Sequence, residues 1–425
     1  MNPVLVAARG KGAVNALRRA GSIGLRYGLS SRPMEGSLAS FARLLAEYGV
    51  GATFPFTADA LARSGDVVER YRDHDIEFAI HGLFHVDHRR LSRDDQFAHV
   101  QRAVDAFHRR GLVPRGFRSP YLRWNDDTLD ALRSVGLEYD ASPAIAWDVL
   151  AGQDTDRYRH VLGFYGAEHA IRFPSVPRLV DGLVQIPYGL PDDEALVERV
   201  PGLEIQTDPW VAALEMAHQR GDLFTLGLHP ERFELCQASL TRTLQRVQDL
   251  HPAVWVARLD EISDWWKSRA AALVSIEDGS DDSIQVAADG PRGTTFLVRG
   301  ISDVGAVPWH GTYQLVSGTR LRIRSDVRPF VGVSPATSPE AVSFLREQGY
   351  IVETITPARR WTVVVDRPTF DGRDAQPLLD LIEGGTEPLV RLGRWPDGAR
   401  SALSITGDID AMTIWDYVRR FRRDG

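Results

Sequence analysis

The chain has 425 residues, of which 43% are hydrophobic, 25% charged and 9% aromatic. These values are those of an ordinary globular protein, so they exclude a disordered chain and a fibrous repeat. The 50 basic and 57 acidic side chains give a formal net charge of −7. Because an acidic chain has no overall attraction to a polyanion, we expect no nucleic-acid partner.

The sequence has no feature that predicts secretion or membrane insertion. Residues 1–30 hold no apolar run long enough for a secretory signal, and no uncharged apolar stretch of about 18 residues occurs. The single cysteine, Cys236, has no partner for an intrachain disulfide. We therefore expect a cytoplasmic protein without a transmembrane segment, and leave its oligomeric state open.

Helical and strand-like patterns alternate along residues 1–268, which we expect to form one unit. Helices are predicted at 38–48, 60–72, 93–110, 126–135, 209–220 and 240–250, and strands at 50–56, 76–80, 116–118, 137–140, 223–228 and 254–257. Strand, helix and strand at this spacing indicate an α/β fold, with a parallel sheet wound as a barrel.

The pattern changes after residue 268. Short β-rich runs separated by Asp, Gly and Pro predict a small sandwich-like insert over 269–336, followed by a mixed α/β connector over 337–394. Residues 395–425 return to the α/β pattern, with an apolar strand at 402–405 that ends in two acidic residues.

Two histidines follow a predicted strand in the sequence HGLFH. His81 and His85 come just after the strand at 76–80, and parallel barrels build their active sites at the carboxyl ends of their strands. The spacing of four residues suits two ligands of one cation, and neutral imidazoles favour zinc, cobalt, nickel or iron. The alternative is a pair of surface or capping histidines.

Asp408 and Asp410 end the apolar strand at 402–405 with one residue between them. Alternation along a strand directs both carboxylates to the same face, where one can hold a metal and the other act as a general base. The alternative is an aspartate that only caps the following helix.

Two further polar side chains follow strands. Arg118, in FRSPY, is able to orient a carboxylate through a bidentate contact, and His229, in LGLHPER, suits a general acid near neutral pH. The alternatives are a surface arginine beside a proline turn and a hydrogen-bonded histidine at a sheet end.

Taken together, four motifs resemble the polysaccharide deacetylases, the NodB-homology or carbohydrate esterase four family. They are TFPFT (Thr53–Thr57), HGLFH (His81–His85), RSPY (Arg118–Tyr121) and LGLH (Leu226–His229). The resemblance covers residues 35–265 and implies a distorted, incomplete (β/α) barrel. It also implies removal of acetyl groups from sugars with one divalent metal, most commonly zinc.

One departure from the family concerns its acidic strand-end motif, which normally precedes the TFF-like strand. No such motif precedes Thr53, yet TGDID occurs at Thr406–Asp410. The simplest interpretation is a circular permutation in which the first barrel strand is encoded near residue 405 and lies beside the strand of Thr53.

The resemblance implies a role for each matching residue. Asp410, His81 and His85 would be the metal ligands, and Asp408 the general base. Arg118 would orient Asp408, and His229 would protonate the leaving amine. The backbone N–H of Tyr121 would help to bind the oxyanion.

The expected substrate is an acetylated sugar or glycan precursor, and Trp124, Trp147 and Tyr188 are candidates for a sugar-stacking cleft. Two other functions stay open. One is a catalytically inactive barrel that binds glycan or acts as a scaffold, and the other is an amidohydrolase acting on a non-sugar C–N bond.

Overall fold

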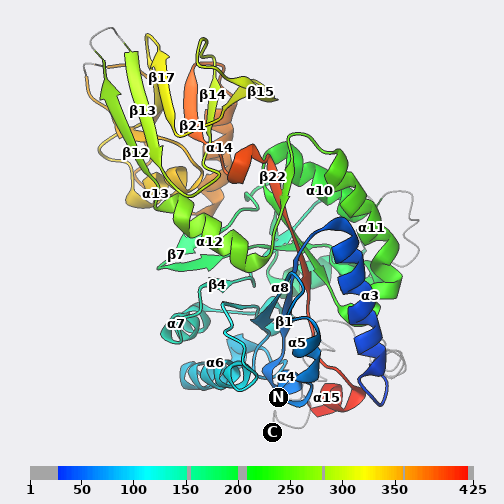
Figure 1. Ribbon diagram of the computed structural model, residues 1–425. Helices are drawn as coiled ribbons and strands as arrows, with labels where there is room; N and C mark the ends of the chain where they lie inside the picture. Colours follow the sequence, from blue (N-terminus) through cyan, green and yellow to red (C-terminus); the bar gives the residue numbers. More distant parts are fainter. Residues whose placement is uncertain (1–26, 151–154, 200–207, 280–282, 358, 420–425) are drawn as a thin grey trace.

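The computed structural model describes residues 27–150, 155–199, 208–279, 283–357 and 359–419. An α/β unit and a second unit of smaller sheets are joined by α12 (Leu259–Ala270) and by the segment that precedes β22 (Ser401–Gly407) (Figure 1). Within this part of the chain, no helix combines the length and the apolar character needed to cross a membrane. Most of the region examined for a secretory signal, residues 1–26, lies outside the described residues.

The largest sheet of the described residues has 12 strands and curls into an open barrel. Its neighbouring strands are parallel except for the last pair, β8 and β7. In spatial order they are β6 (Glu168–His169), β5 (Ala144–Ala146), β9 (Tyr188–Leu190), β10 (Leu223–Leu228), β22, β1 (Ala52–Phe56), β2 (Ile76–Ile80), β3 (Gly116–Phe117), β4 (Tyr139–Asp140), β8 (Leu183–Gln185) and β7 (Arg178–Val180), with β11 (Val254–Val256) paired to β22 as a branch. No pairing among the described residues joins β6 to β7, so the barrel is incomplete, as the sequence predicted.

Helices connect these strands and cover the outside of the sheet (Figure 1). They are α3 (Arg32–Tyr48), α4 (Ala58–Arg63), α5 (Asp66–Arg70), α6 (Arg93–His108), α7 (Asp126–Ser134), α8 (Asp156–Tyr165), α9 (Asp193–Arg199), α10 (Pro209–Arg220), α11 (Phe233–Asp249) and α15 (Ile414–Arg419), with short 3-10 helices η1 (His88–Arg90), η2 (Pro120–Leu122) and η3 (Pro230–Arg232). The apolar face of α3 shows how they pack. The ring of Phe41 lies 5.3 Å from that of Phe54 in β1 and 5.0 Å from that of Phe233 in α11.

Strand β22 lies in the middle of the sheet, between β10 and β1. All seven of its residues are buried, and Ala402–Gly407 pair in parallel register with Leu223–Leu228. On the other side Thr406 pairs with Thr53. The expectation that the strand at 402–405 lies beside that of Thr53 is therefore confirmed.

The second unit contains three small sheets and two helices. Its elements are β12 (Leu273–Asp278), β13 (Ser283–Asp289) and β17 (Arg320–Arg324) in one sheet, β15 (Val307–His310), β16 (Tyr313–Val316), β14 (Phe296–Arg299) and β21 (Leu389–Leu392) in the next, and β19 (Val352–Thr354), β18 (Arg328–Val333) and β20 (Trp361–Val365) in the third, with α13 (Pro339–Glu347), α14 (Ala375–Glu383), η4 (Gly372–Asp374) and η5 (Pro396–Gly398).

Three strand pairings in this unit cross the boundary expected near residue 336. Strand β14 pairs with β21, and β18 pairs in parallel with β19 and β20. The sequence pattern placed the run that becomes β18 in the sandwich-like insert. Its six buried residues instead fit the centre of a parallel sheet. The exact division of the chain into domains stays a prediction.

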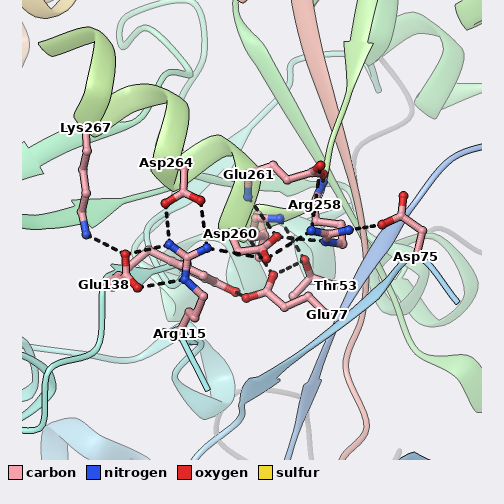
Figure 2. A network of polar contacts seen from close by, with 12 residues as sticks. Thr53, Asp75, Glu77, Arg115, Glu138, Arg258, Asp260, Glu261, Asp264 and Lys267 are labelled. Atoms are coloured by element: carbon pink, nitrogen blue, oxygen red, sulfur yellow. Dashed lines mark hydrogen bonds and ion pairs between the residues drawn. The ribbon is translucent and has the colours of Figure 1, made fainter. Parts of the chain in front are cut away.

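Helix α12 closes the amino-terminal end of the barrel through a buried carboxyl group (Figure 2). Glu77 in β2 accepts hydrogen bonds from the Thr53 hydroxyl at 2.7 Å, from the Tyr139 hydroxyl at 2.8 Å and from the backbone N–H of Asp260 in α12 at 3.1 Å. Burial, and next the negative charge of Asp260, raise the pKa of Glu77 to about 7. The helix that leads into the second unit is thus hydrogen-bonded to the strand ends.

A shell of ion pairs extends this contact toward the surface (Figure 2). Arg115, just before β3, holds Glu138 through two N–H groups, each 2.8 Å from a carboxylate oxygen. The same guanidinium donates to Asp264 of α12, and Lys267 of α12 lies 3.2 Å from Glu138. Paired bidentate contacts of this kind restrict the position of the helix more than single surface ion pairs do.

We expect the stability of the protein to depend on the ionisation of Glu77. Its pKa is higher in the folded chain than the ordinary value of 4.5, so ionisation opposes folding. The free energy of unfolding should fall, by an amount on the order of 3 kcal/mol, as the pH rises from about 5 to 8. Urea denaturation at pH 5 and pH 8 measures this difference, and the Glu77→Gln variant should not show it. Glu69→Gln, at an exposed position, should keep it. Equal pH dependence in wild type and Glu77→Gln would contradict the assignment.

Candidate active site

The predicted site residues follow adjacent strands of the barrel at its carboxyl-terminal end. His229 follows β10, Asp408 and Asp410 follow β22, His81 follows β2 and Arg118 follows β3. Since β10, β22, β1, β2 and β3 are neighbours in this order, the sheet gathers these side chains at one edge.

His81, His85 and Asp410 form a group that can hold a metal ion. One ligand atom from each lies within 4.8 Å of the others. The Nε2 atom of His81 is 3.3 Å from one carboxylate oxygen of Asp410, and that of His85 is 3.4 Å from the other. Thr57, at the end of β1, donates from its hydroxyl to the Asp410 carbonyl at 3.0 Å and so fixes the loop that carries this carboxylate.

Hydrogen bonding prepares these side chains as ligands. The Nδ1 atom of His81 lies 2.9 Å from the carbonyl oxygen of Arg118, which fixes its proton on Nδ1 and leaves the Nε2 lone pair directed toward Asp410. Burial opposes ionisation of Asp410, but His85 and His81 together hold its pKa well below the usual range. Two neutral imidazole nitrogens and one carboxylate oxygen are donors that fit zinc, cobalt, nickel or iron.

The turn between the two histidines requires glycine. Gly82 has a φ of +75°, and a Cβ there would lie 2.9 Å from the carbonyl oxygen of Phe84 and 3.2 Å from the His88 ring. A residue with a side chain does not fit this backbone without a shift, so the glycine contributes to the positions of both imidazoles.

A buried ion pair lies beside the candidate metal ligands. The guanidinium of Arg118, fully buried, lies 2.6 Å from one oxygen of Asp408 and also donates to the Thr406 hydroxyl and the Ala141 carbonyl. The other oxygen of Asp408 is 4.0 Å from Nε2 of His81. One carboxylate oxygen is therefore held by the arginine while the other faces the candidate metal position.

His229 is paired with a carboxylate that the sequence analysis did not single out. Asp193, the first residue of α9, accepts from the backbone N–H of His229 at 2.9 Å and from its Nδ1 at 2.7 Å. Burial alone would lower the pKa of His229, but the negative charge of Asp193 and its hydrogen bond raise that pKa well above its usual value. The only sequence signal for Asp193 is the acidic run that follows strand β9. Such a run is equally typical of the first turn of a helix.

Tyr121 lies next to His85 in a left-handed backbone conformation. Its φ is +59°, that of Leu122 is +55°, and its ring centroid is 4.3 Å from that of His85. Two successive non-glycine residues at positive φ are unusual and cluster at functional sites. The turn after Arg118 therefore has the geometry of a site loop.

The structure contradicts two of the three predicted sugar-stacking residues. Trp147 is only 1% exposed and packs edge-on against Phe224, so its ring belongs to the core. Tyr188 is 2% exposed, its ring lies under the guanidinium of Arg118 and its hydroxyl donates to Asp192. Trp124 is half-buried against the main core, and its contact with substrate stays a prediction.

Comparison with known proteins agrees with the resemblance stated from the motifs. Residues 32–139 match the family model described as polysaccharide deacetylase. The matched segment contains the TFPFT, HGLFH and RSPY motifs and covers about a quarter of the chain. A search of curated protein sequences finds no significant match.

Solved structures that match part of the chain include two polysaccharide deacetylases. A putative polysaccharide deacetylase from Mycobacterium smegmatis is 20% identical, with 56% of this chain and 77% of that chain covered and a TM-score of 0.42. A probable polysaccharide deacetylase from Pseudomonas aeruginosa PAO1 is 19% identical, with 58% and 76% covered and a TM-score of 0.44. A structure described as Puue allantoinase is 18% identical, with 54% and 72% covered and a TM-score of 0.42.

We expect Asp410→Asn to bind zinc about tenfold or more weakly than wild type, because an amide oxygen carries no charge for the cation. Calorimetric titration of zinc into metal-free protein near neutral pH measures the difference. The control is Asp181→Asn, an exposed position far along the chain from the cluster, which should bind as wild type does. Equal zinc affinity in Asp410→Asn and wild type would rule out Asp410 as a ligand.

Proposed function

We propose that this protein is a metal-dependent hydrolase that removes an acetyl or similar acyl group from an N-acylated sugar in a glycan or glycan precursor. The observation that carries the proposal is the meeting of His81, His85 and Asp410 beside the Asp408–Arg118 pair. The polysaccharide deacetylase match over residues 32–139 supports the acetylated sugar as substrate class.

A bound divalent cation, most commonly zinc with this donor set, supplies Lewis acidity toward an acyl carbonyl and a water molecule. The cation would be held by the two Nε2 atoms and the Asp410 carboxylate. Its affinity depends on pH, because both imidazoles must be neutral to act as ligands.

Asp408 is placed to take a proton from the attacking water. Arg118 holds one oxygen of Asp408 at 2.6 Å, so the second oxygen is available to accept the proton. Arg118 in turn is held by the Thr406 hydroxyl and by the ring of Tyr188, 4.6 Å from the guanidinium carbon. Arg118 therefore acts as a positioning residue for the base.

His229 is placed to return a proton to the leaving amine. Asp193 holds the imidazole by its Nδ1 and keeps it protonated to a higher pH than an ordinary histidine. The backbone N–H of Tyr121 would stabilise the negative oxygen that develops on the acyl carbon. Water and the amide are thereby converted into a carboxylate and a free amine.

We further propose that the barrel strands are circularly permuted relative to the family, with residues 395–425 completing the barrel of residues 1–268. The position of β22 between β10 and β1 supports this order. The expected acidic strand-end motif is thus supplied from the far side of the second unit.

We expect Asp408→Asn to reduce kcat by roughly 10²–10⁴, since an amide does not accept the proton of water. Acetate release from acetylated chito-oligosaccharides by the zinc-loaded protein measures the loss. Zinc affinity should stay within about threefold of wild type, which separates a missing base from a missing metal. An unchanged kcat in the Asp408→Asn variant would contradict the proposal that Asp408 is the general base. Absence of acetate release by zinc-loaded wild type would favour a glycan-binding barrel or a non-sugar amide substrate.

We expect Asp193→Asn to move the alkaline limb of the kcat–pH profile to lower pH. The carboxylate raises the pKa of His229, so its removal lowers that pKa, and the proton needed by the leaving amine is lost earlier as the pH rises. Acetate release measured at about ten pH values would define the limb in both proteins. Identical alkaline limbs would show that His229 is not the group that titrates.

A further inference from the structure

A second cavity, of about 300 Å³, lies at the opposite end of the barrel from the candidate metal ligands. Its walls come from the end of α10, the loop before β22, the hairpin of β15 and β16, and α14. In Figure 1 this is where the second unit meets the barrel, at the start of β22. The cavity therefore lies between the two units and shares no residue with the candidate active site.

The wall of this cavity carries four guanidinium groups and three carboxylates, and one of these carboxylates, Asp380, is exposed and accepts a hydrogen bond from Gln376. Asp222 is buried and forms ion pairs with two arginines, Arg220 at 2.8 Å and Arg394 at 3.2 Å. Glu383 pairs with Arg391 at 2.5 Å. Two carboxylates thus neutralise three buried or half-buried guanidinium groups.

A fourth cation, Arg400, has no ion pair among the described residues. Its Nη2 donates to the Gln219 carbonyl, and its Nε is buried without an acceptor. The Nε of Arg394, a residue only 8% exposed, is also buried without an acceptor. Burial, and then the positive charges of Arg394 and Arg391, lower the pKa of Arg400 to about 10.

Behind the cavity wall lies a further buried arginine, whose charge Glu347 partly compensates. Arg269 of α12 is 3% exposed, and its Nε and Nη1 have no acceptor among the described residues. Burial of like charges close together is unfavourable unless an anion compensates them. The described side chains supply too few carboxylates, so an anion from solution would satisfy both the charge and the unused N–H groups.

An aromatic surface adjoins these arginines. Trp309 lies half-exposed in the cavity wall, with its indole N–H donating to the Gly398 carbonyl at 2.7 Å and its ring 5.3 Å from the guanidinium carbon of Arg400. The hydrogen bond fixes the plane of the ring. A fixed indole beside guanidinium groups suits a ligand that joins a sugar ring to an anionic group.

We propose that this cavity binds an anionic sugar, whose phosphate or carboxylate group pairs with Arg400 and Arg394 and whose ring contacts Trp309. Guanidinium groups match both oxyanions by paired N–H donors. The site is separate from the candidate active site, so it neither requires nor excludes the proposed hydrolysis.

Calorimetry on the full chain tests the proposal with three probes, glucose 6-phosphate, glucuronate and neutral glucose, at constant ionic strength. We expect one molecule of at least one anionic probe to bind per chain, and glucose to bind about tenfold or more weakly than that probe. The Arg400→Gln variant should bind the anionic probe more weakly by a similar factor, because Arg400 is the cation without an ion pair among the described residues. The matched control is Arg359→Gln, an exposed arginine of the second unit paired with Asp278, which should bind as wild type does.

Comparison of the two anionic probes shows whether the ligand's anionic group is a phosphate or a carboxylate. Tighter binding of glucose 6-phosphate than glucuronate would identify a phosphorylated ligand, and the reverse order a carboxylated one. Absence of binding by both anionic probes to wild type would overturn the proposal. Unchanged affinity in Arg400→Gln, with an unfolding temperature equal to that of wild type, would overturn it as well.

Discussion

The backbone pairing of β22 with β10 on one side and β1 on the other is the constraint on which the site depends. Thr406 is paired with Thr53, and this register sets how far Asp408 and Asp410 project beyond the strand. A slip of one residue would turn both carboxylates to the opposite face, away from His81. The same strand holds Arg118 through the Thr406 hydroxyl, so a single register fixes the proposed base, its partner and one candidate metal ligand.

Charge at the site is buried in matched pairs. Arg118 with Asp408, and His229 with Asp193, each join one cation to one carboxylate at 2.6 Å and 2.7 Å. Removing one member would leave the other as an uncompensated buried charge, which costs more than the pair contributes. The cavity at the other end of the barrel differs in this respect, because its guanidinium groups outnumber their carboxylates. The ion pairs of the candidate active site are thus complete within the chain, whereas the cavity is where we propose that an anionic ligand supplies the missing charge.

Local periodicity predicted β1 to β4, β10, β11 and β22, and the strand-end positions of His81, Arg118, His229 and Asp408 followed from them, but it predicted none of the short elements from β5 to α9. It failed where a residue's environment is set by distant chain segments. Trp147 and Tyr188 are aromatic residues near predicted site loops, but Phe224 and Arg118 pack against them and remove their rings from solvent. Asp193 was missed because an acidic residue in the first turn of a helix is ordinary, and only the fold brings it to His229. Strand β18 pairs with β19 and β20, which follow residue 336, and this could not be predicted since an apolar run carries no information about its partners.

The position of β22 in the sheet also has a consequence for biosynthesis. A ribosome makes β1 and β10 first, then the whole second unit, and only afterwards the strand that separates them. At roughly 5–20 residues per second, this interval is on the order of ten seconds or more. During it the facing edges of β1 and β10 have no central neighbour, and the nascent barrel exposes unpaired backbone groups. Asp408 and Asp410, the proposed base and the candidate carboxylate ligand, join the site only after β22 has emerged, so a prematurely terminated product would lack both carboxylates.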